Sequence, residues 1–256
     1  MRNTLAIARR EITEYFTSPV AYVLLFVFMF LSGYFFYALT FSFNRMVVQT
    51  SMNPQFAPTL NINQHIIQPL FGTNSTILLF IIPMLTMGLL AKEKGSRTSE
   101  LLLTAPITNS QLILGKYLSA LAMLTLLLTL TLVYPLYLEY YGDPDWGPTL
   151  SGFLGIWLLA ASFAAVGLLT SSLTKNQVVA VVLSFGALLI FWLIDFLADA
   201  LGPQAAAVVS YLSILEHFDR MNQGIIDTQD IVFYLSIVIF CLLLSQTMIQ
   251  SHRWRR

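Results

Sequence analysis

The chain has 256 residues, of which 57% are hydrophobic and only 10% are charged, and its mean hydropathy is +0.73. A soluble core of that composition would be hard to keep in water, so the composition indicates a polytopic membrane protein. The charges of thirteen basic and thirteen acidic residues cancel. The chain therefore lacks the net positive charge that would suggest nucleic acid as a partner. The single cysteine, Cys241, excludes an intrachain disulfide framework.

The N-terminal segment 1–17 carries an amphipathic pattern. Leu5, Ala8, Ile12 and either Tyr15 or Phe16 recur at steps of three and four residues, which predicts a helix suited to lie in the membrane interface. Charged residues interrupt the first sixteen positions, which argues against a cleaved signal peptide.

Six apolar segments follow, each close to the roughly 20 residues that cross a bilayer core. They span residues 19–39, 73–91, 117–138, 150–170, 178–194 and 231–250. The pattern predicts an all-α polytopic membrane protein, with six transmembrane helices in a single domain over residues 1–256. Pro83 stands inside the second segment and should kink that helix.

The distribution of basic residues predicts the orientation of the chain. On the six-span layout, eleven of the thirteen Lys and Arg residues lie on the side of the two termini, and only Arg45 and Arg220 lie on the other. Lys and Arg accumulate in cytoplasmic loops. Both termini and the segment 92–116 are therefore expected in the cytoplasm.

The segment 92–116 is the only charge-dense stretch of the chain. Glu93 and Arg97 stand four residues apart and Glu100 follows three later, so on a helix they would line one face with alternating sign. The next three positions form an apolar knob of Leu101, Leu102 and Leu103.

Pro106 should end that helix, because proline lacks a backbone donor and restricts the residue before it. Thr108, Asn109 and Ser110 are candidate caps for the helix that follows. This arrangement suits a loop that grips a soluble partner, and it also suits a solvated connection without a partner. The pattern by itself leaves both interpretations open.

The same stretch carries a family resemblance. It reads Glu93-x-Gly95-x-Arg97-Thr98-x-Glu100-Leu101-Leu102-Leu103-Thr104-x-Pro106-Ile107-Thr108, closed by Gly115-Lys116. This motif resembles the first cytoplasmic loop of ABC type-2 (ABC-2) exporter permeases, most closely the gliding-motility and nitrous-oxide-reductase-maturation branch. The segment 213–230 also resembles the family's sequence before the last helix, and the six-span layout extends the likeness over the whole chain.

The resemblance implies a permease subunit of an ATP-binding cassette exporter in the cytoplasmic (inner) membrane, with 1–17 as its elbow helix. The implied partners are a separate cytosolic ATPase subunit that binds ATP, a second permease subunit in a homo- or heterodimer, and an accessory membrane protein. It also implies which residues contact the ATPase, namely Glu93, Arg97, Glu100, Leu101, Leu102, Leu103 and Pro106.

No catalytic motif accompanies this pattern. The only Gly-Lys pair, Gly115-Lys116, lacks the upstream glycine and the following Ser or Thr of a phosphate-binding loop, so we expect ATP hydrolysis in a separate subunit. His65, His217 and His252 are far apart in sequence, so no metal site is expected and they are interpreted as surface residues. We expect no cofactor.

A substrate path has three candidate residues. Asp195 lies near the outer end of the fifth segment, where an ionisable side chain suits either the interface or substrate exit. Thr125 and Thr129 in the third segment could line a path, although such threonines usually bond their own backbone. The alternative function is a non-transporting membrane anchor or assembly protein that recruits a cytosolic partner.

Overall fold

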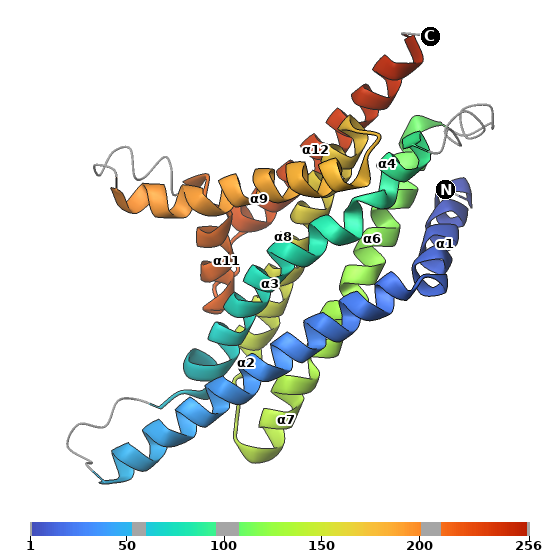
Figure 1. Ribbon diagram of the computed structural model, residues 1–256. Coiled ribbons are helices and arrows are strands. Elements are labelled where there is room, and N and C mark those ends of the chain that lie inside the picture. The colour runs from blue at the N-terminus through green and yellow to red at the C-terminus, as the bar shows by residue number, and fades with distance from the viewer. Residues whose placement is uncertain (1, 53–59, 96–107, 201–210, 255–256) are drawn as a thin grey trace.

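The computed structural model describes residues 2–52, 60–95, 108–200 and 211–254, and for residues 195–200 and 251–254 only the backbone. All described regular structure is helical (Figure 1). In chain order the helices are α1 (Arg2–Thr17), α2 (Pro19–Met52), the π-helical turn η2 (Asn63–Ile67), α3 (Gln68–Thr86), α4 (Gly88–Gly95), α6 (Asn109–Thr131), α7 (Val133–Tyr141), α8 (Trp146–Leu173), α9 (Gln177–Ala200), α11 (Ile214–Asn222) and α12 (Thr228–Trp254).

Within the described residues, six helical stretches are long and apolar enough to cross a membrane. This confirms the predicted all-α membrane fold, and α1 is the predicted elbow helix before the first span. Figure 1 shows α1, α4, the first turns of α6 and the C-terminal end of α12 at one end of the bundle. The opposite end holds α7 and the last turns of α2.

The first span is longer than its apolar segment. We expected a span over 19–39 followed by a loop, but α2 continues to Met52 as a 34-residue helix. No proline or glycine stands between residues 40 and 52, so nothing local stops the helix once the chain leaves the apolar segment. Hydropathy predicts where the chain leaves the membrane. It does not predict where the helix ends, which depends on residues that break helices, such as proline and glycine.

Two other spans consist of two helices each. Pro83 lies inside α3, and the helical stretch is interrupted one turn later at Met87, before α4 begins at Gly88. In the third span Pro135 has no N–H to donate to the carbonyl of Thr131, the last residue of α6. The chain turns at Leu132 and restarts as α7.

Helix α8 forms the centre of the bundle and contacts α3, α6, α9, α11 and α12. Its buried face is rich in small residues, which let neighbouring helices approach closely. An added Cβ at Gly155 would lie 2.9 Å from Met221 of α11, and one at Gly167 would lie 2.1 Å from the Thr86 hydroxyl of α3. Glycine is therefore needed at both crossings.

The start of α6 has a complete capping box. The Thr108 hydroxyl accepts a hydrogen bond from the N–H of Gln111, and the Gln111 side chain accepts one from the N–H of Thr108. Two N–H groups that the first turn leaves without helical partners are satisfied in this way. Of the three predicted caps, Thr108 is therefore the one at the N-cap position.

Replacing Gly167 with alanine should separate α3 from α8. The new methyl group would overlap Thr86, whose hydroxyl is buried and donates to the carbonyl of Ile82, so we expect a loss of about 1–3 kcal/mol in stability. Thermal unfolding in detergent, followed by size-exclusion chromatography, measures the change. Gly186→Ala is the matched control because an added Cβ there meets no atom within 4 Å; an equal loss in both variants would contradict the close crossing.

Candidate functional site

The elbow helix α1 lies directly against the first turns of α6. The buried residues of α1 are Ile7, Ala8 and Glu11, and an added Cβ at Gly115 of α6 would lie 2.8 Å from the Ile7 side chain. The predicted apolar stripe is divided, since Leu5 is 64% exposed while Ala8 faces the protein. Helix α1 therefore packs on the bundle with one face and leaves another free for lipid.

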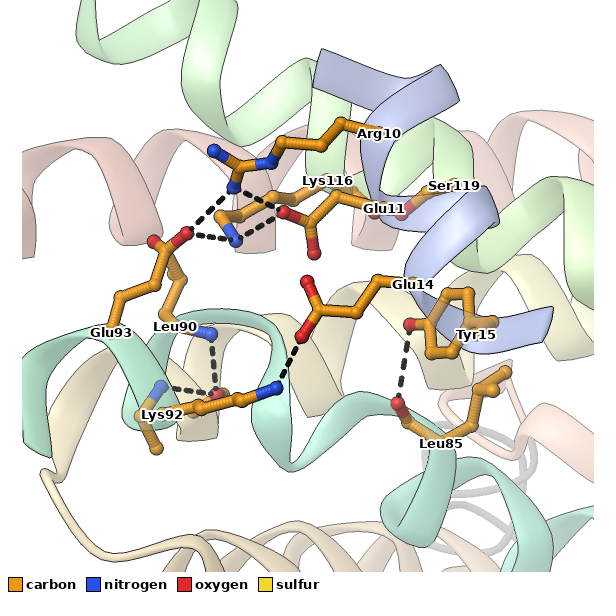
Figure 2. Close-up of polar contacts among 12 residues, drawn as sticks. Arg10, Glu11, Glu14, Tyr15, Leu85, Leu90, Lys92, Glu93, Lys116 and Ser119 are labelled. Atoms are coloured by element: carbon orange, nitrogen blue, oxygen red, sulfur yellow. Dashed lines mark hydrogen bonds and ion pairs between the residues drawn. The ribbon is translucent and has the colours of Figure 1, made fainter. Parts of the chain in front are cut away.

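Four charged side chains form an ion cluster where α1, α4 and α6 meet (Figure 2). Lys116 Nζ of α6 lies 3.1 Å from Glu11 Oε1 of α1 and 2.8 Å from Glu93 Oε1 of α4. Arg10 Nη2 lies 2.7 Å and 3.0 Å from the same two oxygens. The Oε1 atoms of Glu11 and Glu93 thus each contact both cations, and the charges within the ion cluster cancel.

Burial makes this ion cluster sensitive to the loss of any member. The Lys116 side chain is 1% exposed and the side chains of Glu11 and Glu93 are 10% and 15% exposed, whereas Arg10 is half exposed. Charges removed from water in this way need partners of opposite sign close by. The ammonium group of Lys116 joins α6 to α1 and to α4.

A second ion pair lies beside the ion cluster. The ammonium group of Lys92 in α4 contacts the carboxylate of Glu14 in α1, and this hydrogen bond lowers the pKa of Glu14. The hydrogen bond to Glu11 raises the pKa of Arg10. One turn along α1, the Tyr15 hydroxyl donates to the carbonyl of Leu85 at 3.3 Å. Both helices of the second span are therefore bound to α1.

The hydroxyl of Ser171 in α8 supports the break between α3 and α4. It accepts hydrogen bonds from the N–H groups of Leu90 and Ala91 at 3.1 and 3.0 Å, and it donates to the carbonyl of Met87 at 2.9 Å. These are backbone groups that an interrupted helix leaves without helical partners. One buried hydroxyl thereby fixes the start of α4 on the central helix.

Among the predicted ATPase-contact residues, Glu93 lies on the last turn of α4 and takes part in the ion cluster. The other six, Arg97, Glu100, Leu101, Leu102, Leu103 and Pro106, lie outside the described residues. The segment 96–107 that contains them is flanked by α4 and α6, so both of its flanks contribute a member of the ion cluster, Glu93 before it and Lys116 after it.

Two of the three candidate path residues, Thr125 and Thr129, lie one turn apart on α6. The Thr125 hydroxyl donates to the Leu121 carbonyl and accepts from the indole of Trp157 at 2.9 Å. The Thr129 hydroxyl donates to the carbonyl of Thr125 from an exposed position. Asp195 belongs to α9, and its side chain lies outside the described residues.

The interpretation of His217 as a surface residue was wrong. Its side chain is buried, with Nδ1 2.6 Å from Asp230 Oδ1 and Nε2 3.0 Å from the carbonyl of Tyr211. Helix α11 carries His217 on an apolar face with Phe218 and Met221, and that face packs against α8. Among the residues that the structure describes, no three His, Cys, Asp or Glu side chains could hold a metal ion together.

Sequence reasoning missed Glu11 and Lys116 as partners. They are separated by 105 positions, and Lys116 was counted among the loop charges that mark orientation. A signal was nevertheless present in the sequence. No acidic residue lies within one helical turn of Lys116 on either side, and an apolar segment follows it. A lysine in that setting needs a carboxylate from elsewhere in the fold.

The fold and the ion cluster define a multi-pass α-helical membrane protein whose interfacial helix is bonded to its second and third spans. A family model described as an ABC-2 family transporter protein matches residues 5–249, and the chain belongs to that family. No curated protein matches the chain. The match is to the family as a whole, and the gliding-motility or nitrous-oxide-reductase-maturation branch stays a prediction.

Replacing Lys116 with methionine should destabilise the protein by about 3 kcal/mol, because it leaves Glu11 and Glu93 buried with Arg10 as their shared cation. Thermal unfolding in detergent measures the loss, and Lys175→Met on the exposed turn before α9 is the control. Adding Glu11→Gln should recover part of the loss, since contacting charges couple. Strictly additive effects of the two substitutions would contradict the ion cluster.

Proposed function

We propose that this chain is the permease subunit of an ATP-binding cassette exporter of the cytoplasmic membrane. In this proposal both termini face the cytoplasm, a second permease subunit completes the translocation path, and a separate ATPase subunit binds and hydrolyses ATP. Membership of the ABC-2 transporter family supports the transport role. The concentration of basic residues on the side of the termini supports the orientation.

The observation that carries the coupling proposal is the position of the ion cluster. Glu93 and Lys116 stand on the two flanks of segment 96–107, and both bond to α1. An exposed loop on two independent helix ends would absorb a displacement locally. A loop whose two ends share buried ion pairs passes a displacement to the helices that hold those ends.

The contacts around the ion cluster define which helices would move together. Helices α4 and α6 would follow segment 96–107, and α1 would follow both through Glu11 and Arg10. Ser171 would carry the displacement from α4 into α8. We propose that closure of the ATPase subunits pushes on Leu101, Leu102 and Leu103, with Arg97 and Glu100 setting the register of docking.

Glu93 has a different role in this proposal from the one that its spacing suggested. Its carboxylate is mostly buried against Lys116 and Arg10, so it acts as a positioning residue that holds α4 against α1. Thr125, Thr129 and Asp195 stay candidates for the substrate path, and Asp195→Asn with unchanged transport would remove Asp195 from it.

Coupling is tested by purifying the chain with its candidate ATPase in nanodiscs and comparing the ATPase rate of the complex with that of the free ATPase. Replacing Leu101, Leu102 and Leu103 together with serine should weaken the complex by at least about ten-fold, since buried apolar anchors dominate interfaces. Glu93→Gln removes one charge of the ion cluster, so its folded fraction is first isolated by size-exclusion chromatography; that fraction should still bind the ATPase but show a smaller change in rate.

The controls separate docking from folding. Leu126→Ser removes an exposed leucine from α6, and Glu139→Gln neutralises an acid at the opposite end of the bundle; both should behave as the unmodified protein. If the leucine triple variant binds and couples normally, the docking role is wrong. If no ATPase forms a complex with the unmodified chain, the anchor function replaces the exporter.

A further inference from the structure

A cavity lies between α1, α2, the second span and Gln177 at the start of α9, beside the ion cluster. Its volume is about 190 Å³, and its walls are of two kinds. One end is charged, with Glu11 and Glu14 of α1 and Lys92 of α4. The other end is apolar and is formed by Val20, Ala21, Leu24, Met84, Leu85 and Leu89. The cavity is therefore amphipathic, with charged and apolar walls like the two sides of a membrane surface.

The apolar end opens toward the bilayer. Val20 and Met84, on the facing sides of α2 and α3, are 46% and 49% exposed. Large apolar side chains that are exposed on a transmembrane helix contact lipid. An acyl chain can thus pass between the two helices while the polar part of the same molecule remains beside α1.

At the charged end, the hydrogen bonds among the described residues reach only one oxygen of each glutamate. Among the described residues, Arg10 and Lys116 both donate to Oε1 of Glu11, and Lys92 donates to Oε1 of Glu14. Within the described residues the second oxygen of each carboxylate has no partner, and in Figure 2 both carboxylates point into the space between α1 and α4. Lys92 lowers the pKa of Glu14, so this group is charged at neutral pH.

We propose that this cavity binds a phospholipid of the surrounding bilayer whose headgroup carries a primary ammonium group, of the phosphatidylethanolamine class. The ammonium group would lie between Glu11 and Glu14 and donate to their second oxygens, since charge-assisted hydrogen bonds of this kind are strong. The phosphate would lie beside the ammonium group of Lys92 at the rim. The acyl chains would lie along Val20, Leu24 and Met84.

Charge balance favours this headgroup over the other common ones. The three acids and three bases of the region, Glu11, Glu14, Glu93, Arg10, Lys92 and Lys116, sum to zero, so a zwitterion adds no uncompensated charge. A phosphatidylglycerol headgroup would bring a net negative charge toward two carboxylates. A choline headgroup has no N–H with which to bond them.

The test is native mass spectrometry of the delipidated full-length protein with phosphatidylethanolamine, phosphatidylcholine and phosphatidylglycerol of identical acyl chains. One phosphatidylethanolamine should bind about ten-fold more tightly than either of the others. Glu14→Gln should reduce that preference to about three-fold or less. Equal binding of the ethanolamine and choline lipids by the unmodified protein would overturn the proposal.

A cavity-filling variant provides a second and independent test. Gly88 lines the cavity, and an added Cβ there meets no atom within 4 Å, so a side chain can begin at this position without a clash and Gly88→Leu should reduce the space for a lipid. It should reduce tight binding of all three lipids at this site. Gly186→Leu, on α9 with equally open surroundings, is the matched control and should bind as the unmodified protein does.

A soluble probe identifies the source of the headgroup. Glycerophosphoethanolamine carries the same ammonium and phosphate groups without acyl chains, and it should not compete with the lipid at equal concentration. Competition at equal concentration would contradict a lipid site and indicate a site for a soluble amine. A phosphatidylethanolamine preference that persists in both Glu14→Gln and Gly88→Leu would place the lipid elsewhere on the protein.

Discussion

The buried ammonium group of Lys116 constrains the whole end of the molecule at which the two chain ends lie. A lysine with 1% of its side chain exposed needs carboxylates, and this fold supplies one from α1 and one from α4. That requirement explains why α1 packs against α6 rather than lying free in the interface. It also explains why Glu93 turns inward, and why the two flanks of segment 96–107 are held together.

A second constraint acts inside the membrane, where no water can separate the helices. Helix α8 meets its neighbours through glycine and other small residues, and the crossings at Gly155 and Gly167 leave no room for a methyl group. Buried hydroxyls then satisfy the backbone where helices break, as Ser171 does for α4. Helix α4 connects these two regions, because it packs against α8 and contributes Glu93 to the ion cluster.

The two proposals use the same region in different ways. The coupling proposal depends on the buried side of the ion cluster, where Lys116 joins Glu11 to Glu93. The lipid proposal depends on the open side, where Glu11 and Glu14 face a cavity. A bound zwitterionic headgroup would add a further contact between α1 and α4, so the bilayer would contribute to the stiffness of the element that the ATPase is proposed to move.

Composition and periodicity determined the membrane class, the six spans and the amphipathic helix over 1–17, because hydropathy acts on each segment separately. The cap at Thr108 was also within reach, since a capping box is a local pattern. The length of α2 could not be predicted from hydropathy, because the helix continues beyond the apolar segment that defines the span. The partners of Lys116 and of His217, and the cavity beside Glu14, depended on tertiary structure alone. In each case the residues come from different helices, and no local sequence pattern predicts how those helices are placed relative to one another. Burial then determines which charged groups must be paired.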